Sequence, residues 1–365
     1  MSRAFKHVSR KDDHILYAPL PDSQFARKSA WFEYVELVHA AVPEIDFSEV
    51  SVSTEFLGFK LKAPLLIAGM TGGTPLAKKL NAVFAKAAEE LGLALGVGSQ
   101  RVALEAPELR DTFSVVREVA VSVPVIANIG ASQLVEGFSV DAVENLVEMI
   151  EADALAVHLN PLQEVLQPEG DAKYAGLIER LKELVELSPV PVIVKETGAG
   201  VSREAAAKLA SAGVQGIDVG GAGGTSFARI EGLRSLSMGD ELLHQLAEDF
   251  SEWGIPTAAS ILEVKSAAAG LLVVATGGLR SGVDAAKALR LGADLCGFAH
   301  PVLRSALEEG YEGTVRYLRR VIEGLKRALF LTGSRNLAEF RRAPAVLRGE
   351  LREWVELRGL RAPGF

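Results

Sequence analysis

Short continuous apolar runs recur along the chain, and an amphipathic stretch follows most of them. Runs such as 63–70 (APLLIAGM) and 271–278 (LLVVATGG) are typical of strands buried on both faces of a parallel sheet. Stretches such as 75–92 (PLAKKLNAVFAKAAEELG) repeat apolar residues at helical spacing and close on glycine. Eight strands are predicted, at 63–70, 93–100, 123–130, 154–160, 191–198, 216–221, 271–278 and 293–299. The alternation predicts an α/β protein with eight β/α units.

Glycine and polar residues gather where these runs end, in GMTGG, GSQR, NIG, HLN, KETG, GGAGGT and TGG. A doubly wound sheet also holds many β/α units, so the number of strands alone leaves two folds open. A (β/α)₈ barrel keeps its active-site residues at the carboxyl ends of its strands, which meet at one mouth. We therefore predict a (β/α)₈ TIM barrel with an N-terminal extension and extra C-terminal helices.

The length of 365 residues exceeds the roughly 250 of a minimal barrel, and no stretch has the composition of a linker. We expect a single domain over 1–365. In it, 1–60 form an extension that contributes to the substrate site, 61–300 form the barrel, and 301–365 add C-terminal helices. The connection after the sixth strand, from about 225 to 270, is long enough to be a candidate lid and includes a predicted helix near 258–269.

Composition and charge exclude several classes of protein. A formal net charge of −8 argues against nucleic-acid binding, although it leaves room for a local basic pocket. No apolar run approaches the roughly 20 residues that span a bilayer, and the first residues lack a secretory signal. A single cysteine, Cys296, excludes an intrachain disulfide, so we expect a cytoplasmic protein.

Two glycine-rich strand ends, at 220–227 and 275–289, favour phosphate binding. Backbone N–H groups freed by glycine, followed by a helix N-terminus, form a concavity that accepts phosphate oxygens. In barrels of this kind a cofactor phosphate often sits after the seventh and eighth strands, where Gly277, Gly278 and Leu279 lie. The alternative is that these glycines only form a tight turn.

Charged and amide side chains follow the fourth and fifth strands. Lys195, in VKETG, is expected to point into the mouth as a Schiff-base nucleophile, as a charge facing an anionic cofactor, or as an ion-pair partner. The segment HLNPLQE brings His158, Asn160, Gln163 and Glu164 to the same rim. A single carboxylate among amides suits Mg²⁺, which keeps water and phosphate ligands. The alternative for Glu164 is a solvated loop carboxylate.

Further polar groups are expected at the mouth. The second strand ends in Ser99, Gln100 and Arg101, and arginine can hold a diphosphate with two parallel hydrogen bonds. Thr71 and Asn128, which end the first and third strands, are placed to hydrogen-bond a flat heterocycle. The charged run RKDDH at 10–14 reads by itself as a solvated tail.

Taken together in this order, RKDDHI, GMTGG, VGSQR, ANIG, HLNPLQE, VKETG, GGAGGT and TGGLRSGVD resemble the type 2 isopentenyl-diphosphate isomerases over most of the chain. The combination of RKxDH with HxNxxQE is specific, whereas the glycine turns are shared with many flavin barrels. The resemblance implies an enzyme that interconverts isopentenyl and dimethylallyl diphosphate with reduced FMN and Mg²⁺. NADPH or another reductant would serve only to reduce the flavin.

The resemblance also implies roles for individual residues. Catalysis would fall to Gln163, His158 and Lys195, and the metal to Glu164. Substrate binding would involve Arg10, Lys11, His14, Ser99, Gln100, Arg101, Asn160 and Gln163. FMN would contact Ala68, Gly69, Met70, Thr71, Ser99, Asn128, Lys195, Thr225, Gly277, Gly278, Leu279 and Ala299. The apolar C-terminal helices favour self-association as a homo-oligomer, a tetramer or an octamer.

Two positions depart from the expected pattern. Relatives commonly carry serine at the position of Gly220, so a side-chain contact to the cofactor is expected to be missing. His300, in GFAHP, lies at a place expected to vary, and it receives no role.

Three other functions compete. A 2-hydroxy-acid oxidase needs a His/Arg pair at the last strands, and the sequence reading finds none. An IMP-dehydrogenase-like enzyme needs a nucleophilic cysteine on a loop, whereas Cys296 lies inside the eighth predicted strand, where an inert thiol is expected. A non-catalytic phosphate-binding barrel would not need Glu164, Gln163 and Lys195 at one mouth.

Overall fold

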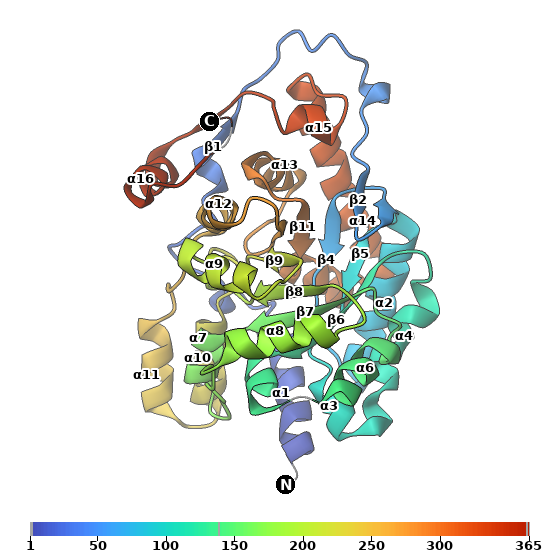
Figure 1. Ribbon diagram of the computed structural model, residues 1–365, viewed down its shortest axis with the longest axis vertical. Coiled ribbons are helices and arrows are strands. Elements are labelled where there is room, and N and C mark those ends of the chain that lie inside the picture. The colour runs from blue at the N-terminus through green and yellow to red at the C-terminus, as the bar shows by residue number, and fades with distance from the viewer. Residues whose placement is uncertain (1–2, 138, 363, 365) are drawn as a thin grey trace.

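The computed structural model describes residues 3–137, 139–362 and 364, and its centre is a closed barrel of eight parallel strands (Figure 1). In barrel order from the first predicted strand, these are β4 (Leu65–Ile67), β5 (Ala94–Gly96), β6 (Val125–Gly130), β7 (Ala154–Leu159), β8 (Val192–Glu196), β9 (Gly216–Asp218), β10 (Leu272–Ala275) and β11 (Leu295–Phe298). β11 pairs with β4 and closes the ring. The predicted (β/α)₈ barrel is confirmed, and each strand falls within its predicted range.

Register between neighbouring strands brings the site residues together. His158 in β7 pairs with Lys195 in β8, and Lys195 in turn pairs with Asp218 in β9. Because side chains of paired residues on adjacent parallel strands point to the same face, these three polar groups stand in one row across the barrel. They lie at or near the carboxyl ends of their strands, so the row faces the mouth.

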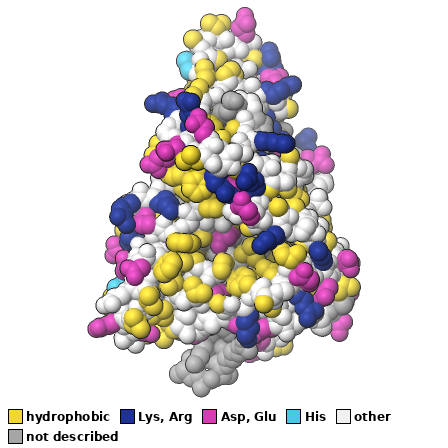
Figure 2. Space-filling view, turned by 60° about the vertical axis from the view of Figure 1, so that its left-hand side comes forward, with side chains coloured by type: hydrophobic (Ala, Val, Ile, Leu, Met, Phe, Trp, Pro, Cys, Tyr) yellow, Lys and Arg dark blue, Asp and Glu magenta, His cyan; other side chains and the backbone are white. Residues whose placement is uncertain are grey.

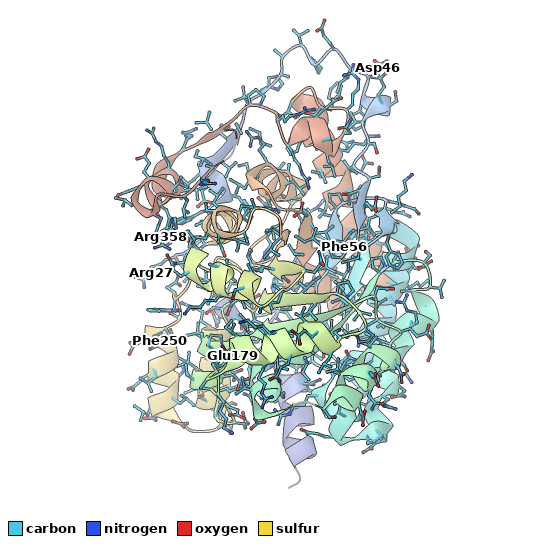
Figure 3. The ribbon with its side chains drawn as sticks, viewed as in Figure 1. Arg27, Asp46, Phe56, Glu179, Phe250 and Arg358 are labelled. Atoms are coloured by element: carbon cyan, nitrogen blue, oxygen red, sulfur yellow. The ribbon has the colours of Figure 1, made fainter. Side chains whose placement is uncertain are left out.

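Apolar side chains fill the barrel below this row. The inner cluster contains Phe56, Leu61, Leu66, Ala94, Ile126, Ala154, Ala156, Ile193, Val274 and Leu295. Two of them, Phe56 and Leu61, come from the hairpin of β2 (Thr54–Phe56) and β3 (Phe59–Leu61), which therefore closes the amino-terminal end of the barrel (Figure 3). The floor of the barrel is apolar, and the polar site residues lie at the opposite end.

Helices surround the barrel. They are α2 (Pro75–Leu91), α4 (Asp111–Val119), α6 (Val140–Met149), α8 (Leu177–Leu187), α9 (Arg203–Ser211), α12 (Thr257–Ala267), α13 (Gly282–Leu291) and α14 (His300–Leu331). Several begin at a serine or threonine whose hydroxyl accepts a hydrogen bond from the first turn, as Thr74 does for α2 and Ser281 for α13. Short helices α3 (Arg101–Glu105), α5 (Ala131–Gly137) and α7 (Pro161–Leu166) follow β5, β6 and β7.

A segment of the N-terminal extension pairs with a segment of the C-terminal region outside the ring. β1 (Val35–Leu37) pairs antiparallel with β12 (Ala345–Leu347), and α15 (Leu337–Phe340) and α16 (Gly349–Arg358) follow α14. Arg358 of α16 contacts Glu263 of α12 and Glu204 of α9, which fixes α16 to the barrel helices (Figure 3). Extra C-terminal helices are therefore present, as predicted.

The first of the two helices inserted after β9 covers the mouth together with the N-terminal helix, and the second packs against the first. α10 (Phe227–Ser237) and α11 (Glu241–Asp249) separate β9 from α12, the predicted helix of this connection. α10 packs against α1 (Arg3–Tyr17) and α7, and α1 also contacts α3 (Figure 1). The connection expected to form a lid thus covers the mouth, and its movement remains a prediction.

Among the residues described, no helix combines the length and the apolar character that crossing a bilayer requires.

Candidate functional site

A single cavity of about 370 Å³ opens at the carboxyl ends of the strands, beneath α1 and α10. The sequence-predicted residues that line it are Arg10, Lys11, His14, Ala68, Gly69, Met70, Thr71, Ser99, Arg101, Asn128, His158, Asn160, Gln163, Glu164, Lys195, Thr225, Gly277, Gly278, Leu279 and Ala299. They come from α1 and from the ends of all eight strands. The structure therefore brings together every predicted site residue except Gln100.

Gln100 needs a correction, because its side chain points into the protein wall. It is fully buried, its Nε2 donates to the carbonyl of Leu146 at 3.0 Å, and its Oε1 accepts the backbone N–H of Asn128 at 3.0 Å. Both ends of the amide are therefore used to hold β6 and α6 in place. We withdraw the assignment of a substrate contact to Gln100.

The charged run at 10–14 is a helix over the cavity rather than a tail. Lys11 donates from Nζ to the carbonyl oxygen of Ser99 at 2.7 Å and lies 5.0 Å from the ring centroid of Phe113. Burial, reinforced by the nearby charge of Arg10, lowers the pKa of Lys11 to about 7. No carboxylate pairs with this amine among the described residues, so the position suits an anionic ligand.

Arg10 is a second cation without a close carboxylate. Its Nη1 reaches the Oε1 of Gln167 at 3.4 Å, and burial is the main cause that lowers the pKa of its guanidinium. Glu164 and Glu231 oppose that shift from a distance. Arginine and lysine side by side in a cavity match the charge and the oxygen-rich surface of a diphosphate.

Glu231, a residue that sequence reasoning missed, joins three elements of the mouth. Its carboxylate has no exposed surface. It lies 2.8 Å from His14 Nε2 on α1, accepts Gln163 Nε2 of α7 at 3.1 Å, and accepts Arg234 Nη1 at 2.6 Å. His14 and Arg234 hold the pKa of Glu231 down to about 2 against its burial. The acid is therefore ionised and anchors both α1 and Gln163.

Amide groups at the end of β7 form a second chain of hydrogen bonds. Asn160 donates from Nδ2 to Gln163 Oε1 at 3.2 Å and to Glu164 Oε1 at 2.8 Å. The hydroxyl of Tyr174, also missed from the sequence, donates to Asn160 Oδ1 at 3.1 Å. Both amide side chains are more than nine-tenths buried, so their orientations are fixed.

Glu164 fits the single-carboxylate metal ligand that was predicted. Its Oε2 accepts Gln167 Nε2 at 2.5 Å and the backbone N–H of Asp171 at 2.7 Å, while its Oε1 accepts only Asn160. A carboxylate has about four acceptor sites, so one remains on Oε1. No group of three or more His, Cys, Asp or Glu side chains with metal-binding geometry occurs among the described residues. This donor set suits Mg²⁺ held largely by water and phosphate.

His158 is neutral in this environment. Burial, and then the charges of Lys195, Arg10 and Lys11, lower its pKa to about 3. Its Nδ1 lies 2.8 Å from Asn128 Oδ1. An amide oxygen only accepts, so Nδ1 carries the proton and Nε2 is left as an acceptor.

Lys195 stands at the centre of the row formed by β7, β8 and β9. Its Nζ donates to the carbonyl of Glu196 at 3.3 Å and lies 3.9 Å from Asp218 Oδ2. Asp218 is buried and also accepts the hydroxyl of Thr276. This contact with Asp218 is the ion pair that was one of the three alternatives for Lys195. At 3.9 Å it is loose, so the ammonium keeps hydrogen-bonding capacity toward the cavity.

Interlocked glycine turns form the other end of the cavity. Gly277 and Gly278 have φ of +99° and +76°, and an added Cβ at Gly277 would lie 2.0 Å from the carbonyl oxygen of Gly221. A Cβ at Gly224 would lie 2.5 Å from the Gly278 nitrogen. Only glycine lets these two backbones meet, which leaves a surface of peptide groups suited to phosphate oxygens.

Polar groups at this end remain available for a cofactor. Thr225 shares hydrogen bonds with Gln24 of the N-terminal extension, and Gln24 Oε1 accepts Arg280 Nη2 at 3.0 Å. The hydroxyl of Thr71 is buried without a hydrogen-bond partner in the described part of the chain. An orphaned hydroxyl and a glycine cradle that line one cavity fit a bound heterocycle with a phosphate tail, which is the shape of FMN.

Gly220 has a backbone that serine would strain. Its φ is +45°, and a Cβ would lie 1.9 Å from the carbonyl oxygen of Glu196. The backbone of this loop therefore favours glycine at position 220, which supplies no side-chain contact to the cofactor.

The structure corrects the sequence reading of the last strands. Arg280 follows β10 and His300 follows β11, and both line the cavity, so a His/Arg pair is present there. Arg280 was seen in the sequence only as a neighbour of the glycine turn. His300 follows the next strand of the barrel, which pairs directly with β10, so the two side chains lie on neighbouring loops.

Cys296 is fully buried in β11, and burial raises the pKa of its thiol. The expectation of an inert cysteine agrees with this environment.

Comparison with protein families and with curated proteins gives a consistent result. The profile described as FMN-dependent dehydrogenase matches residues 140–347. The isopentenyl-diphosphate delta-isomerase of Ignicoccus hospitalis is 46% identical over 96% of this chain and 97% of its own length. The protein of the same name from Pyrobaculum arsenaticum is 51% identical, over 96% of this chain and 98% of its own.

Solved structures with the same fold are more distant in sequence. A lactate oxidase of Pediococcus acidilactici superposes with a TM-score of 0.67 at 13% identity, covering 95% of this chain and 94% of its own. A mandelate oxidase variant with an FMN adduct gives a TM-score of 0.63 at 18% identity, covering 95% of this chain and all of its own. At such identities the likeness shows a shared fold alone.

Glu231→Ala tests the anchor of the mouth. We expect it to lower the free energy of unfolding by about 3–5 kcal/mol, because it leaves the buried Arg234 without its closest partner. Urea unfolding measures this, with the exposed Glu179→Ala on α8 as the control, which should change stability by less than about 0.5 kcal/mol. Equal effects of the two variants would show that Glu231 anchors nothing.

Proposed function

This chain belongs to the isopentenyl-diphosphate delta-isomerase family, and we propose that it interconverts isopentenyl and dimethylallyl diphosphate using bound reduced FMN. The relatives span nearly the whole chain at 44–51% identity. The observation that carries the proposal is a cavity with two cationic ends and a row of oriented polar groups between them. Such a cavity can hold a flavin and a diphosphate side by side.

The glycine end is proposed to hold the flavin. Gly277, Gly278 and Leu279 would cradle its phosphate with Thr225 and Ala299, while Ala68 to Thr71, Ser99 and Asn128 would line the ring. Lys195 would face the negative charge of the reduced ring, and the 3.9 Å gap to Asp218 leaves its ammonium available. When bound, reduced FMN supplies acid–base chemistry at the alkene without net oxidation of the substrate.

The α1 end is proposed to hold the diphosphate. Arg10, Lys11 and Arg101 would supply the positive charge, and His14 would complete this end. Ser99 already accepts from Lys11 through its carbonyl oxygen. α1 and α10 would exclude water once the substrate is bound, which protects a cationic transition state.

Oriented neutral groups are proposed to serve the reacting alkene. Gln163 is fixed by Asn160 and Glu231, and His158 is neutral with Nε2 as an acceptor. A neutral imidazole and an amide can orient an apolar substrate or relay a proton without adding charge near the developing cation.

The test is an anaerobic assay with isopentenyl diphosphate, reduced FMN and Mg²⁺ in heavy water. We expect dimethylallyl diphosphate that carries deuterium, formed without consumption of reductant beyond that needed to reduce the flavin. Product formation that consumes one reductant per turnover, or no product at all, would refute the proposal.

The oxidase alternative gains one observation, because Arg280 and His300 are a His/Arg pair at the last strands. They lie beside the glycine turns, at the proposed phosphate end, so they are poorly placed to hold a carboxylate substrate. Reduction of bound FMN by a 2-hydroxy acid such as lactate would favour the oxidase. Colourless protein that does not retain FMN would favour a non-catalytic phosphate-binding barrel.

Glu164→Gln should raise the Mg²⁺ concentration for half-maximal turnover by at least about tenfold while FMN stays bound, because it removes charge from the metal but no flavin contact. Metal titration of the isomerase reaction measures this. The matched control is Glu169→Gln, a cavity carboxylate paired with Arg234, which should leave the metal dependence unchanged. Identical metal curves for wild type and Glu164→Gln would remove the metal ligand assignment.

Lys11 predicts a pH dependence for kcat/KM. In the free enzyme its pKa is about 7, so it is charged below that pH and loses its charge above it. Attraction for the diphosphate, and with it kcat/KM, should therefore fall as pH rises through 7. Lys11→Met should lower kcat/KM about tenfold at pH 6 and abolish this fall, while the exposed Lys60→Met should retain the wild-type profile. A Lys11→Met profile parallel to wild type would place the diphosphate elsewhere.

We propose three further points. NADPH would reduce the flavin, and the single cysteine agrees with a cytoplasmic location. A homo-oligomer, a tetramer or an octamer, is supported by exposed apolar side chains on and beside α11, namely Leu236, Met238, Leu242, Leu246, Phe250 and Trp253. Figure 2, which brings this side of the molecule forward, shows hydrophobic side chains gathered over its lower half. A monomeric mass by light scattering would refute the oligomer.

A further inference from the structure

We propose that the imidazole of His300 binds the phosphate of the flavin cofactor, as an addition to the backbone cradle at Gly277 and Gly278. The inference rests on the proposed function, because it needs a flavin phosphate at the glycine end of the cavity. It assigns a binding role to a side chain that the mechanism above does not use.

His300 lies where the glycine end of the cavity meets a helix N-terminus. It is the first residue of α14, directly after β11, and it lines the cavity together with Gly277, Gly278 and Arg280. The peptide dipoles of the first turn of α14 give this corner a positive potential. The position therefore favours an anion.

The backbone of Pro19 lies near the ring of His300, but neither ring nitrogen has a hydrogen-bond partner at ordinary hydrogen-bonding geometry among the described residues. Both ring nitrogens are buried, and neither forms a hydrogen bond within the described part of the chain. A buried polar side chain without partners is rare in folded proteins and indicates a ligand or an ordered water. On the cavity wall, His300 is the described residue with two buried side-chain nitrogens that lack a hydrogen bond.

The charges around the ring favour an anionic ligand over a cationic one. Burial, and then the charges of Arg280 and Arg304, lower the pKa of His300 to about 4, while the backbone of Pro19 and the carboxylate of Glu308 oppose the shift. Without a ligand the ring is neutral at pH 7 and can donate from one nitrogen. A cationic ligand would meet Arg280, whereas a phosphate would accept from the ring and from the guanidinium together.

Two anions are expected in this cavity, and topology distinguishes them. β11 and β7 are four strands apart in a closed ring of eight, so they lie on opposite sides of the barrel. His300 follows β11, whereas the proposed metal ligand Glu164 follows β7. The anion nearest His300 is therefore the flavin phosphate rather than the substrate diphosphate.

The experiment compares FMN with riboflavin, which lacks the phosphate. Protein stripped of flavin is titrated with each ligand, and quenching of flavin fluorescence gives the dissociation constants. His300→Ala should weaken FMN binding by about tenfold and leave riboflavin binding unchanged, since the lost interaction is a hydrogen bond to a charged group. His300→Gln, which keeps an N–H donor, should recover part of the loss. The exposed His39→Ala is the matched control and should bind both flavins as wild type does.

Each other outcome overturns the inference in a different way. Unchanged FMN binding in His300→Ala means that the ring makes no contact with the phosphate. Equal weakening of FMN and riboflavin, or a fall in the melting temperature of the flavin-free protein, assigns a packing role. Normal FMN binding with a raised KM for isopentenyl diphosphate assigns the ring to the substrate. A wild-type protein that binds neither flavin refutes the proposed function itself.

Discussion

Burial of positive charge without matching negative charge is the constraint on which this structure depends. Arg10, Lys11 and Arg280 all line one cavity, and burial lowers the pKa of each. Desolvated cations are costly unless a partner compensates them, and the nearest protein partners here are mostly neutral amides and carbonyls. The protein is thus organised to receive anions. The glycine turns, the helix N-terminus of α14 and the helix α1 add to the same potential.

The acidic residues of the mouth are arranged so that they do not neutralise this potential. The carboxylate of Glu231 is hydrogen-bonded to His14, Gln163 and Arg234. The carboxylate of Glu164 accepts hydrogen bonds from Asn160, Gln167 and the backbone N–H of Asp171. The first carboxylate holds α1 and Gln163 in position, and the second keeps one acceptor site open. The carboxylates therefore hold the mouth in shape and supply the proposed metal ligand, while the cations stay available for phosphate groups. This division explains how an acidic protein can bind two anionic ligands.

Much of the fold and most of the cavity wall could be predicted from the sequence, for one physical reason. Strands buried on both faces appear as apolar runs, and in a parallel barrel their carboxyl ends meet, so residues such as Glu164 and Lys195 could be placed at one rim. Side-chain direction at a turn could not be predicted: Gln100 sits at φ −87° and ψ 0°, which turns it into the wall. Glu231 lies in a helix with weak amphipathic patterning, and the burial of the His300 ring nitrogens depends on side-chain packing that the sequence pattern does not reveal. The run at 10–14 looked like a tail because its order comes from Ser99 and Glu231, far away in the sequence.

The central claim is that two anions occupy opposite ends of one cavity at the same time. The most direct measurement is a crystal structure of the protein with FMN and isopentenyl diphosphate, prepared under anaerobic conditions. We predict the flavin phosphate at Gly277 and Gly278, the diphosphate next to Arg10 and Lys11, and the alkene against the flavin ring beside Gln163. A flavin phosphate and a diphosphate that compete for the same end, or a diphosphate outside the cavity, would contradict the account.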